Sequence, residues 1–384
     1  MRTNLDSLFN MSKQVVDGMV ERGWGRVINV SSVNGSKGAF GQTNYSAAKA
    51  GMHGFTKALA LEVARRGVTV NTISPGYIGT KMVLAIPKDV LDSKIIPQIP
   101  LGRLGKPDQP VMAVKVDNTA KAYPQVGLSK ADVVYVEQVE GGVTRLAALF
   151  SSEYPTYVGP VRSARITDIE LLKQYGKVGL AYSGSQNKLA DNLQRAPLGL
   201  VSFDQNRSGY RRAGNRPQPY DVIGTFDRLV ERAGRIDPPT QVGYTFGAVP
   251  AGGKPAAGFT ARYPMARIAG EWSAGQGRWL LSMDGIPLRA AEGGRLGPTT
   301  FIVQFATVTG SNYYDVNGAQ TPMTETVGSG RALILRDGQV FEGRWQRDQA
   351  WQPTHYTVGG QPAVFAPGQI WVALVGRDRP VTVR

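Results

Sequence analysis

The sequence predicts an α/β protein in three parts: residues 1–107, an α/β or α+β domain over 109–238, and a mostly antiparallel β domain over 239–384. In the first part, a strand-like run at 26–31 is followed by a long helical pattern and a second run at 68–74, the order of a parallel strand–helix–strand unit. The second part alternates strand-like and helical runs, and the third has short alternating strands with turn signals such as MDG and RDGQ.

Apolar spacing places the elements of the first part. Residues 4–20 carry a broad apolar face and predict an amphipathic helix. We expect both strands to be buried, and the helix between them to run from near Tyr45 to Gly67. Residues 81–106 predict short helical pieces interrupted by prolines.

Composition narrows the classes of function. The net charge of +15 divides almost equally on either side of Asp108, and no DNA- or RNA-binding motif accompanies it, so no specific nucleic acid partner is expected. Cysteine is absent, and the two histidines, His53 and His355, lie far apart, so no metal centre is expected. No signal peptide and no membrane-spanning apolar run are recognised, which predicts a cytoplasmic protein without a transmembrane segment.

A catalytic pattern lies between Val30 and Lys49. Tyr45 and Lys49 are four residues apart in a helical pattern, so both side chains project from one face. A nearby ammonium favours the phenolate form of a phenol, which suits a tyrosine to general acid catalysis. Ser32 ends the strand-like run RVINVSS, where its hydroxyl can bind a carbonyl oxygen beside Tyr45. Together the three residues predict protonation of a ketone that receives a hydride.

This pattern resembles the short-chain dehydrogenase/reductases, in detail their acetoacetyl-CoA and 3-oxoacyl-thioester reductase branch. The serine lies thirteen residues before YSAAK, TNLDSLFN precedes it, and VTVNTISPGYIGTKM follows at the expected place. The resemblance implies a partial Rossmann-like fold and an acyl-CoA or similar thioester as substrate. It implies that Asn4 holds a proton-relay water, Ser32 binds the carbonyl, Tyr45 is the acid, and Lys49 also binds the nicotinamide ribose. It further assigns Tyr45, Lys49, Pro75, Gly76, Ile78 and Thr80 to the cofactor, and Phe40, Gln42 and Tyr77 to the substrate.

The cofactor implied by this resemblance is NADPH. A dinucleotide domain holds the pyrophosphate with a glycine-rich turn at a helix N-terminus. Only three residues precede Asn4, so this turn and the family's first strands are expected to be missing, and NADPH binding to be weak or absent. A homo-oligomer through the reductase helices is a further expectation.

From Gln109 onward the sequence resembles a different family, the YerB-like lipoproteins, whose N- and C-terminal domains have no assigned activity. The resemblance is carried by VMAVKVDN and YVGPVRSARITDIELLKQYGKVGLAYSGS, and later by GSGRALILRDGQVFEGRWQRD and FAPGQIWVALV. It implies an extracytoplasmic, lipid-anchored relative, whereas this chain carries the reductase fragment where a lipoprotein signal is usual.

A second candidate site lies in GPVRSARITD. We expect Ser163 to cap a helix whose free N–H groups, with Arg162 and Arg165, hold a phosphate or carboxylate. Acidic and basic residues at the ends of neighbouring strand-like runs are expected to line the same cleft: Asp117, Glu137, Glu140 and Arg145. The alternative is that these arginines form structural ion pairs with the acids. The arginine-rich segment 207–221 is interpreted as a solvated loop, with contact to a polyanion as the alternative. Trp345, Trp351 and Trp371 are interpreted as core or strand-packing residues and not as platforms for sugars.

Three functional hypotheses follow. The chain is an NADPH-linked reductase of 3-oxoacyl thioesters, impaired by the missing cofactor half. Alternatively, it is a non-enzymatic ligand-binding protein of the extracytoplasmic type, centred on residues 109–384, with an anionic ligand. The third is a fusion in which an inactive reductase remnant precedes the YerB-like part, as the abrupt change of family at 105–110 without a Gly/Ser linker indicates.

Overall fold

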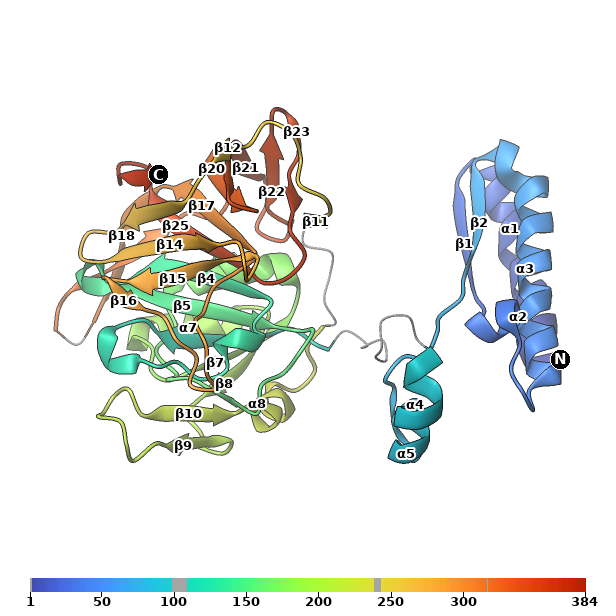
Figure 1. Cartoon of the computed structure of the whole chain (residues 1–384), viewed down its shortest axis with the longest axis horizontal. Coiled ribbons are helices and arrows are strands. Elements are labelled where there is room, and N and C mark those ends of the chain that lie inside the picture. Colours follow the sequence, from blue (N-terminus) through green and yellow to red (C-terminus); the bar gives the residue numbers. More distant parts are fainter. Residues whose placement is uncertain (1, 99–108, 238–242, 316) are drawn as a thin grey trace. The chain divides into compact units, whose positions relative to one another are not determined.

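The computed structural model describes residues 2–98, 109–237, 243–315 and 317–384, and they form two compact units, Met1–Pro107 and Asp108–Arg384. Each unit is described separately below (Figure 1). None of the described helices combines the length and the apolar character that crossing a membrane requires.

The first unit is a two-stranded parallel sheet covered by helices. A π-helical turn at Arg2–Asp6 leads into α1 (Ser7–Glu21), β1 (Gly25–Val30), α2 (Val33–Lys37), α3 (Thr43–Val63), β2 (Val68–Ile73), α4 (Lys81–Leu84) and α5 (Lys88–Val90). β1 and β2 pair in parallel, with Val27 beside Val70, and α3 connects them. Gly67 ends the crossover in the left-handed conformation, as its position in the sequence predicted. The predicted strand–helix–strand unit is therefore confirmed.

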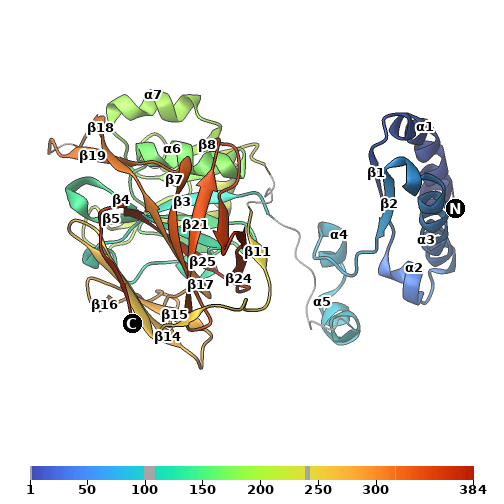
Figure 2. The same cartoon turned by 90° about the horizontal axis from the view of Figure 1, so that it is seen from above.

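The prediction that both strands are buried is wrong for one face of the sheet. Val68 and Val70 pack in a small core with Val16 and Val63, but Ile28 and Val30 are 59% and 58% exposed. Alternate residues of a strand point to opposite faces. Within this unit, α1 and α3 cover only the face that carries Val27 and Val70 (Figure 2). Of the predicted segment 81–106, residues 99–106 lie outside the described part of the chain.

The second unit is built on a large mixed sheet. Its helices are α6 (Ile166–Leu172), α7 (Asn187–Arg195) and α8 (Phe226–Ala233). The large sheet holds β3 (Met112–Asp117), β4 (Val133–Gln138), β5 (Thr144–Phe150), β7 (Val178–Tyr182), β8 (Leu198–Ser202), β12 (Lys254–Pro255), β17 (Thr300–Ala306), β20 (Gly328–Arg336), β21 (Gln339–Arg347), β22 (His355–Val358), β23 (Gln361–Pro362) and β25 (Ile370–Gly376). The sheet order is β23-β22-β21-β20-β17-β25-β4-β5-β3-β7-β8, with β12 beside β21.

The smaller sheets surround this one. A five-stranded antiparallel sheet contains β13 (Gly258–Arg262), β14 (Arg267–Ser273), β15 (Arg278–Met283), β16 (Ile286–Pro287) and β26 (Val381–Val383). The remaining strands are β6 (Tyr157–Val158), β9 (Tyr210–Arg212), β10 (Val222–Thr225), β11 (Thr245–Phe246), β18 (Val308–Tyr314), β19 (Gln320–Thr324) and β24 (Val364–Phe365). Most pairs after residue 243 are antiparallel, as predicted, although β17 pairs with β25 and β11 with β24 in parallel.

Both faces of the large sheet are covered. The five-stranded sheet packs on one face, where Phe259 of β13 lies 4.3 Å from Phe301 of β17 between ring centroids. On the other face, α6 and α7 contribute Leu171, Leu189 and Leu193 to a second core (Figure 2). The sheet runs through strands from both sides of the predicted boundary at 238/239, because β25 pairs in parallel with β4. The boundary itself stays a prediction.

Two interpretations of single segments need correction. Trp345 and Trp371 are buried as predicted, but Trp351 is largely exposed. Segment 207–221 is more than a solvated loop, because it contributes β9 to a three-stranded sheet. Its arginines stack on aromatic rings, among them Arg211 on Tyr157.

Candidate functional site

Helix α3 brings Tyr45 and Lys49 together as their spacing predicted. The Lys49 Nζ lies 5.7 Å from the centroid of the Tyr45 ring. Lys49 is only 9% exposed, and its Nζ donates a hydrogen bond of 2.9 Å to the carbonyl oxygen of Val30 at the end of β1. The Ser31 hydroxyl in turn donates to the carbonyl oxygen of Lys49 at 2.8 Å. These two bonds fix the ammonium between the end of β1 and the tyrosine.

Ser32 lies at the start of α2, two residues after the end of β1. It caps α2, and its Oγ accepts a hydrogen bond from the N–H of Asn34 at 3.2 Å. The hydroxyl proton remains able to donate, because a serine hydroxyl is both donor and acceptor. Gly35 lets α2 lie against α3, since a Cβ at this position would meet the backbone carbonyl carbon of Lys49 at 2.8 Å.

Asn4 lies in the turn that precedes α1, on the side of α3. Its neighbour Leu5 packs against Gly51 of α3, where an added Cβ would meet the leucine side chain at 3.0 Å. The Asn4 carbonyl oxygen accepts a bond from the Ser7 hydroxyl at 3.2 Å. Among the described residues, no hydrogen bond joins the Asn4 side chain to Ser32, Tyr45 or Lys49.

The segment after β2 runs beside the start of α2. The Pro75 carbonyl oxygen accepts the N–H of Val33 at 3.0 Å, and the N–H of Thr80 donates to the carbonyl oxygen of Ile78 at 2.7 Å. Gly76 lies in open space, because an added Cβ would meet no atom within 4 Å. This segment therefore borders the end of β1 from which Ser32 follows.

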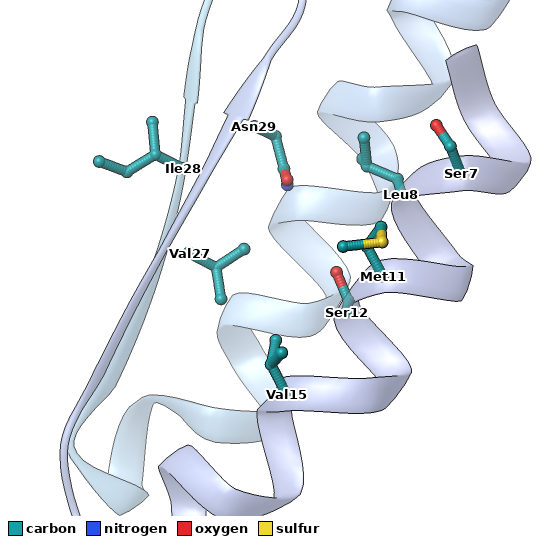
Figure 3. Close-up of a pocket in the computed structure, with 8 residues that line it drawn as sticks. All are labelled: Ser7, Leu8, Met11, Ser12, Val15, Val27, Ile28 and Asn29. Carbon is teal, nitrogen blue, oxygen red and sulfur yellow. The ribbon is translucent and has the colours of Figure 1, made fainter. Parts of the chain in front are cut away.

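The three predicted substrate residues do not form a closed pocket. Phe40 is fully exposed, while Gln42 accepts a hydrogen bond from the Asn34 amide at 3.1 Å. Tyr77 is half-buried, with the Lys37 Nζ 5.9 Å from its ring centroid. A cavity of about 270 Å³ in this unit lies elsewhere, between α1 and β1 (Figure 3). It is lined by Ser7, Leu8, Met11, Ser12, Val15, Val27, Ile28 and Asn29.

The second candidate site is a cleft of about 750 Å³ in the second unit. It lies where β3, β4 and β7, which run in the same direction, reach their carboxyl ends. Loops at this edge commonly carry ligand sites in α/β folds. The cleft is lined by Val139, Glu140, Val143, Arg145, Arg162, Ser163, Arg165, Gly184, Ser185, Gln186, Lys188, Pro219, Asn312, Tyr313, Tyr314, Asp315 and Asn317.

Two of the cleft arginines are held by carboxylates. The Nε of Arg162 donates to Asp117 at 2.9 Å. Arg165 donates to one oxygen of Glu140 through Nε at 2.9 Å and Nη2 at 2.6 Å. Burial alone would raise the pKa of Glu140, but the hydrogen bonds and charge of Arg165 lower it overall. The predicted alternative of structural ion pairs therefore describes Arg162 and Arg165.

The expected helix cap is wrong. Helix α6 begins at Ile166, and Arg165 occupies its cap position. The carboxylate of Asp168 accepts the N–H of Arg165 at 2.6 Å, so the helix end is satisfied from within the helix. Ser163 lies two residues before this cap and lines the cleft instead. The sequence pattern SARITD placed the cap too early because serine is a common capping residue.

Beneath the cleft lies a buried charge cluster that the sequence interpretation missed in part. The Lys115 ammonium of β3 contacts the carboxylates of Glu137 and Asp168, the latter at 2.6 Å, and all three side chains are fully buried. Burial lowers the pKa of Lys115 to about 8, against the opposing charge of Asp168. A lysine inside the apolar run VMAVKVD was the available signal, because a charge in a central strand requires buried partners.

Arg145 differs from the other cleft arginines. It is 6% exposed at the start of β5, opposite Asp117 and Glu137 in the neighbouring strands. Its Nη1 lies 3.5 Å from the carbonyl oxygen of Ser163, and its Nε is buried without a hydrogen-bond partner. Across the described residues, no group of three His, Cys, Asp or Glu side chains is placed so that it could hold a metal ion.

The comparisons with known proteins divide the chain in the same way. Residues 1–90 match the family model of short chain dehydrogenases. Residues 102–237 and 259–372 match the N-terminal and C-terminal domains of DUF3048, a protein family of unknown function. The first part of the chain is thus similar to part of a short-chain dehydrogenase, and the second unit, called the DUF3048 unit below, is similar to the two domains of DUF3048. Both family resemblances recognised in the sequence are thereby confirmed.

Curated relatives of the reductase part are strongly similar. An acetoacetyl-CoA reductase of Cupriavidus necator is 70% identical over 107 residues, which are 28% of this chain and 43% of that protein. An acetoacetyl-CoA reductase of Shinella zoogloeoides is 63% identical over 109 residues, 28% of this chain and 45% of that protein. The chain thus spans less than half the length of these relatives.

A solved structure resembles the DUF3048 part. The YerB protein of Bacillus subtilis superposes with a TM-score of 0.60 at 22% sequence identity, and the match covers 72% of this chain and 94% of that one. At this identity the likeness concerns the fold.

We predict that close packing of α2 on α3 holds the reductase residues in place. Gly35→Ala should destabilise this packing by about 1–3 kcal/mol, because the new Cβ meets the backbone of Lys49 rather than a flexible side chain. Hydrogen exchange in peptides covering α2 and α3 should become faster. Gly54→Ala, at an exposed α3 glycine with open space around it, is the matched control and should stabilise the helix by about 0.5–1 kcal/mol. Exchange in Gly35→Ala as slow as in the parent chain would contradict this prediction.

The buried Lys115 predicts a pH dependence of stability in the DUF3048 unit. Its pKa falls from 10.5 to about 8 on folding, so between these values the unfolded chain binds the proton more tightly than the folded chain. Its contribution to the free energy of unfolding should therefore rise as pH increases through this window. The measurement is the difference in urea unfolding free energy between the chain and Lys115→Met at about pH 7, 8.5 and 10.

Lys130→Met provides the control for that series, because Lys130 is a half-exposed lysine paired with Glu153. At pH 7, Lys115→Met should also be less stable than Lys130→Met by roughly 3–5 kcal/mol, because it leaves two buried carboxylates without their cation. A difference that stays constant or shrinks with pH would show that Lys115 keeps its proton over the whole range.

Proposed function

We propose that residues 1–107 carry the carbonyl-reducing residues of a 3-oxoacyl-thioester reductase, with acetoacetyl-CoA as the representative substrate. The observation that supports this most directly is the anchored ammonium of Lys49, 5.7 Å from the Tyr45 ring and bonded to Val30 at the end of β1. The relatives named as acetoacetyl-CoA reductases share this segment at up to 70% identity.

In this proposal each of four residues has its own role in the reduction of a ketone: Ser32, Tyr45, Lys49 and Asn4. The Ser32 hydroxyl donates to the carbonyl oxygen, because its Oγ is already fixed by the N–H of Asn34. Tyr45 delivers the proton to the same oxygen, and the charge of Lys49 favours the tyrosinate left behind. Asn4, in the turn beside α3, holds the water that returns a proton to Lys49.

Reduction also needs a hydride, which NADPH supplies when bound. The donor set fits the nicotinamide ribose: an ammonium has three N–H donors, and Lys49 uses one on Val30 and a weak one, at 3.8 Å, on the Met52 sulfur. Pro75, Gly76, Ile78 and Thr80 border the same end of β1 and would hold the nicotinamide. For the pyrophosphate, the described residues of the first unit offer no glycine-rich turn at a helix N-terminus next to β1 or β2. We therefore propose weak NADPH binding by these 384 residues.

The test is NADPH oxidation by the purified chain with acetoacetyl-CoA, beside Tyr45→Phe and a titration of NADPH binding. We expect slow turnover with a high KM for NADPH. Tyr45→Phe should lower kcat by about 100-fold or more, because the ring remains and only the acid is lost. Tyr157→Phe, which removes a phenol hydroxyl from an exposed tyrosine of the second unit, is the matched control and should keep the activity of the parent chain.

Turnover that survives Tyr45→Phe would assign the reaction to other residues and overturn the proposal. If the chain neither binds NADPH nor turns it over, the result would favour the alternative, a ligand-binding DUF3048 protein that carries an inactive reductase remnant.

A further inference from the structure

We propose that the cleft of the DUF3048 unit binds a small organic anion, and that Arg145 holds the carboxylate or phosphate group of this ligand. The inference is independent of the reductase proposal, because every residue it uses lies in the second unit.

The first step concerns what Arg145 lacks. Each acid of the cluster already contacts a cation. Asp117 contacts Arg162, and Glu140 contacts Arg165. The remaining acids, Glu137 and Asp168, both contact Lys115. In the described part of the chain, Arg145 forms no ion pair with any of them. Its single hydrogen bond, to the carbonyl oxygen of Ser163, is long at 3.5 Å, and its Nε has no partner.

The second step concerns the cost of this arrangement. A buried polar group without a partner forfeits its hydration, and for a charged group the loss is larger than for a neutral one. Burial, followed by the charges of Arg165 and Arg162, lowers the pKa of Arg145 to about 9, while the charges of Asp117 and Glu140 act against this shift. A guanidinium stays protonated at neutral pH. An oxyanion in the cleft would supply the missing acceptor for the N–H groups of Arg145.

The third step concerns geometry. A guanidinium presents its N–H groups as a planar fork that matches a carboxylate or phosphate through two parallel hydrogen bonds. Arg145 lines the cleft, and Lys188 lies exposed at its rim. Arg162 and Arg165 also line the cleft, each with one side on its own carboxylate. The resulting site offers the guanidinium of Arg145, which forms no ion pair among the described residues, and three supporting cations.

The fourth step concerns the rest of the ligand. A volume of about 750 Å³ exceeds what an inorganic anion fills and suits a molecule the size of a sugar derivative. Away from the arginines, the lining has one carboxylate, Asp315, which accepts the backbone N–H groups of Asn317 and Ala319. The other polar groups of the lining are hydroxyl, amide and phenol groups: Ser163, Ser185, Gln186, Asn312, Tyr313, Tyr314 and Asn317. Gln186 has a buried Oε1 without a partner, an acceptor that a ligand hydroxyl would satisfy. The chemistry therefore fits a hydroxylated anion, such as a sugar acid or a sugar phosphate.

The experiment is isothermal titration calorimetry of the full chain with four probes: glucuronic acid, glucose 6-phosphate, glucose and inorganic phosphate. We expect one or both sugar anions to bind, glucose not to bind, and inorganic phosphate to bind more weakly than the sugar phosphate. The two sugar anions distinguish a carboxylate from a phosphate ligand. Affinity should fall as salt is raised.

Variants assign the binding to Arg145. Arg145→Gln should lower the affinity for the sugar anion by about tenfold or more, because a charge-assisted bidentate contact is lost. Arg145→Lys keeps the charge but loses the fork, and should recover little affinity. Lys188→Gln, at the exposed rim, should weaken binding by about two- to threefold. Arg228→Gln, an exposed arginine on α8, is the control and should bind as the parent chain does.

Three outcomes would overturn the inference: neither sugar anion binds at millimolar concentration, glucose binds as well as its anionic derivatives, or a folded Arg145→Gln binds unchanged. Any of them would indicate that Arg145 serves only to balance the charge of Glu137. Glu137 lies opposite Arg145 in the neighbouring strand, and one of its carboxylate oxygens is buried without a hydrogen-bond partner. If Arg145→Gln does not fold, the salt dependence and the Lys188→Gln variant decide the question, because the exposed lysine makes no core contact.

Discussion

The parallel pairing of β25 with β4 is the constraint on which the DUF3048 unit depends. It joins Ile370 to Val133 and Trp371 to Val134, so strands from the end of the sequence lie at the centre of a sheet begun more than 200 residues earlier. Gln369 strengthens the join, because its amide donates to the carbonyl oxygens of Leu128 and Ala131 and its oxygen accepts the Trp371 indole N–H. Without this pairing, both halves of the sheet would have an open edge.

The same join assembles the cleft. Residues between Val139 and Lys188 supply its charged wall. Much of its polar wall comes from Asn312, Tyr313, Tyr314, Asp315 and Asn317. Hydrogen bonds hold the two walls together: Thr324 N–H donates to the Thr167 hydroxyl at 3.1 Å, and the Thr326 hydroxyl donates to Glu170 at 2.8 Å. The charged groups can remain buried because three of the four cations contact carboxylates directly. Arg145 is the exception, and the proposed anion site rests on this difference.

In the first unit, some contacts of the candidate site are made within one helix, and others need neighbouring elements. Helix α3 needs no distant partner to bring Tyr45 near Lys49, since one helical turn does so. The hydrogen bond from Lys49 to Val30 and the close approach of α2 at Gly35 then orient the pair relative to Ser32. The sequence correctly predicted two strands in this unit. Their predicted burial was wrong for one face of the sheet, where Ile28 and Val30 are exposed. Their apolar composition indicated two covered faces, whereas the helices of this unit cover one.

The sequence by itself determined the features set by short-range geometry. The crossover from β1 through α3 to β2, the pairing of Tyr45 with Lys49 on one helix face, and the strand-rich end of the chain all follow from residue spacing. Motifs also sufficed to recognise both families. Only the tertiary structure decided which charges meet: Lys115 finds Glu137 and Asp168, Arg165 caps α6 in place of Ser163, and Arg145 is left without a carboxylate. The physical reason is that partners of buried charges come from different strands and loops, and their contacts depend on a sheet whose strand order is not written in local sequence.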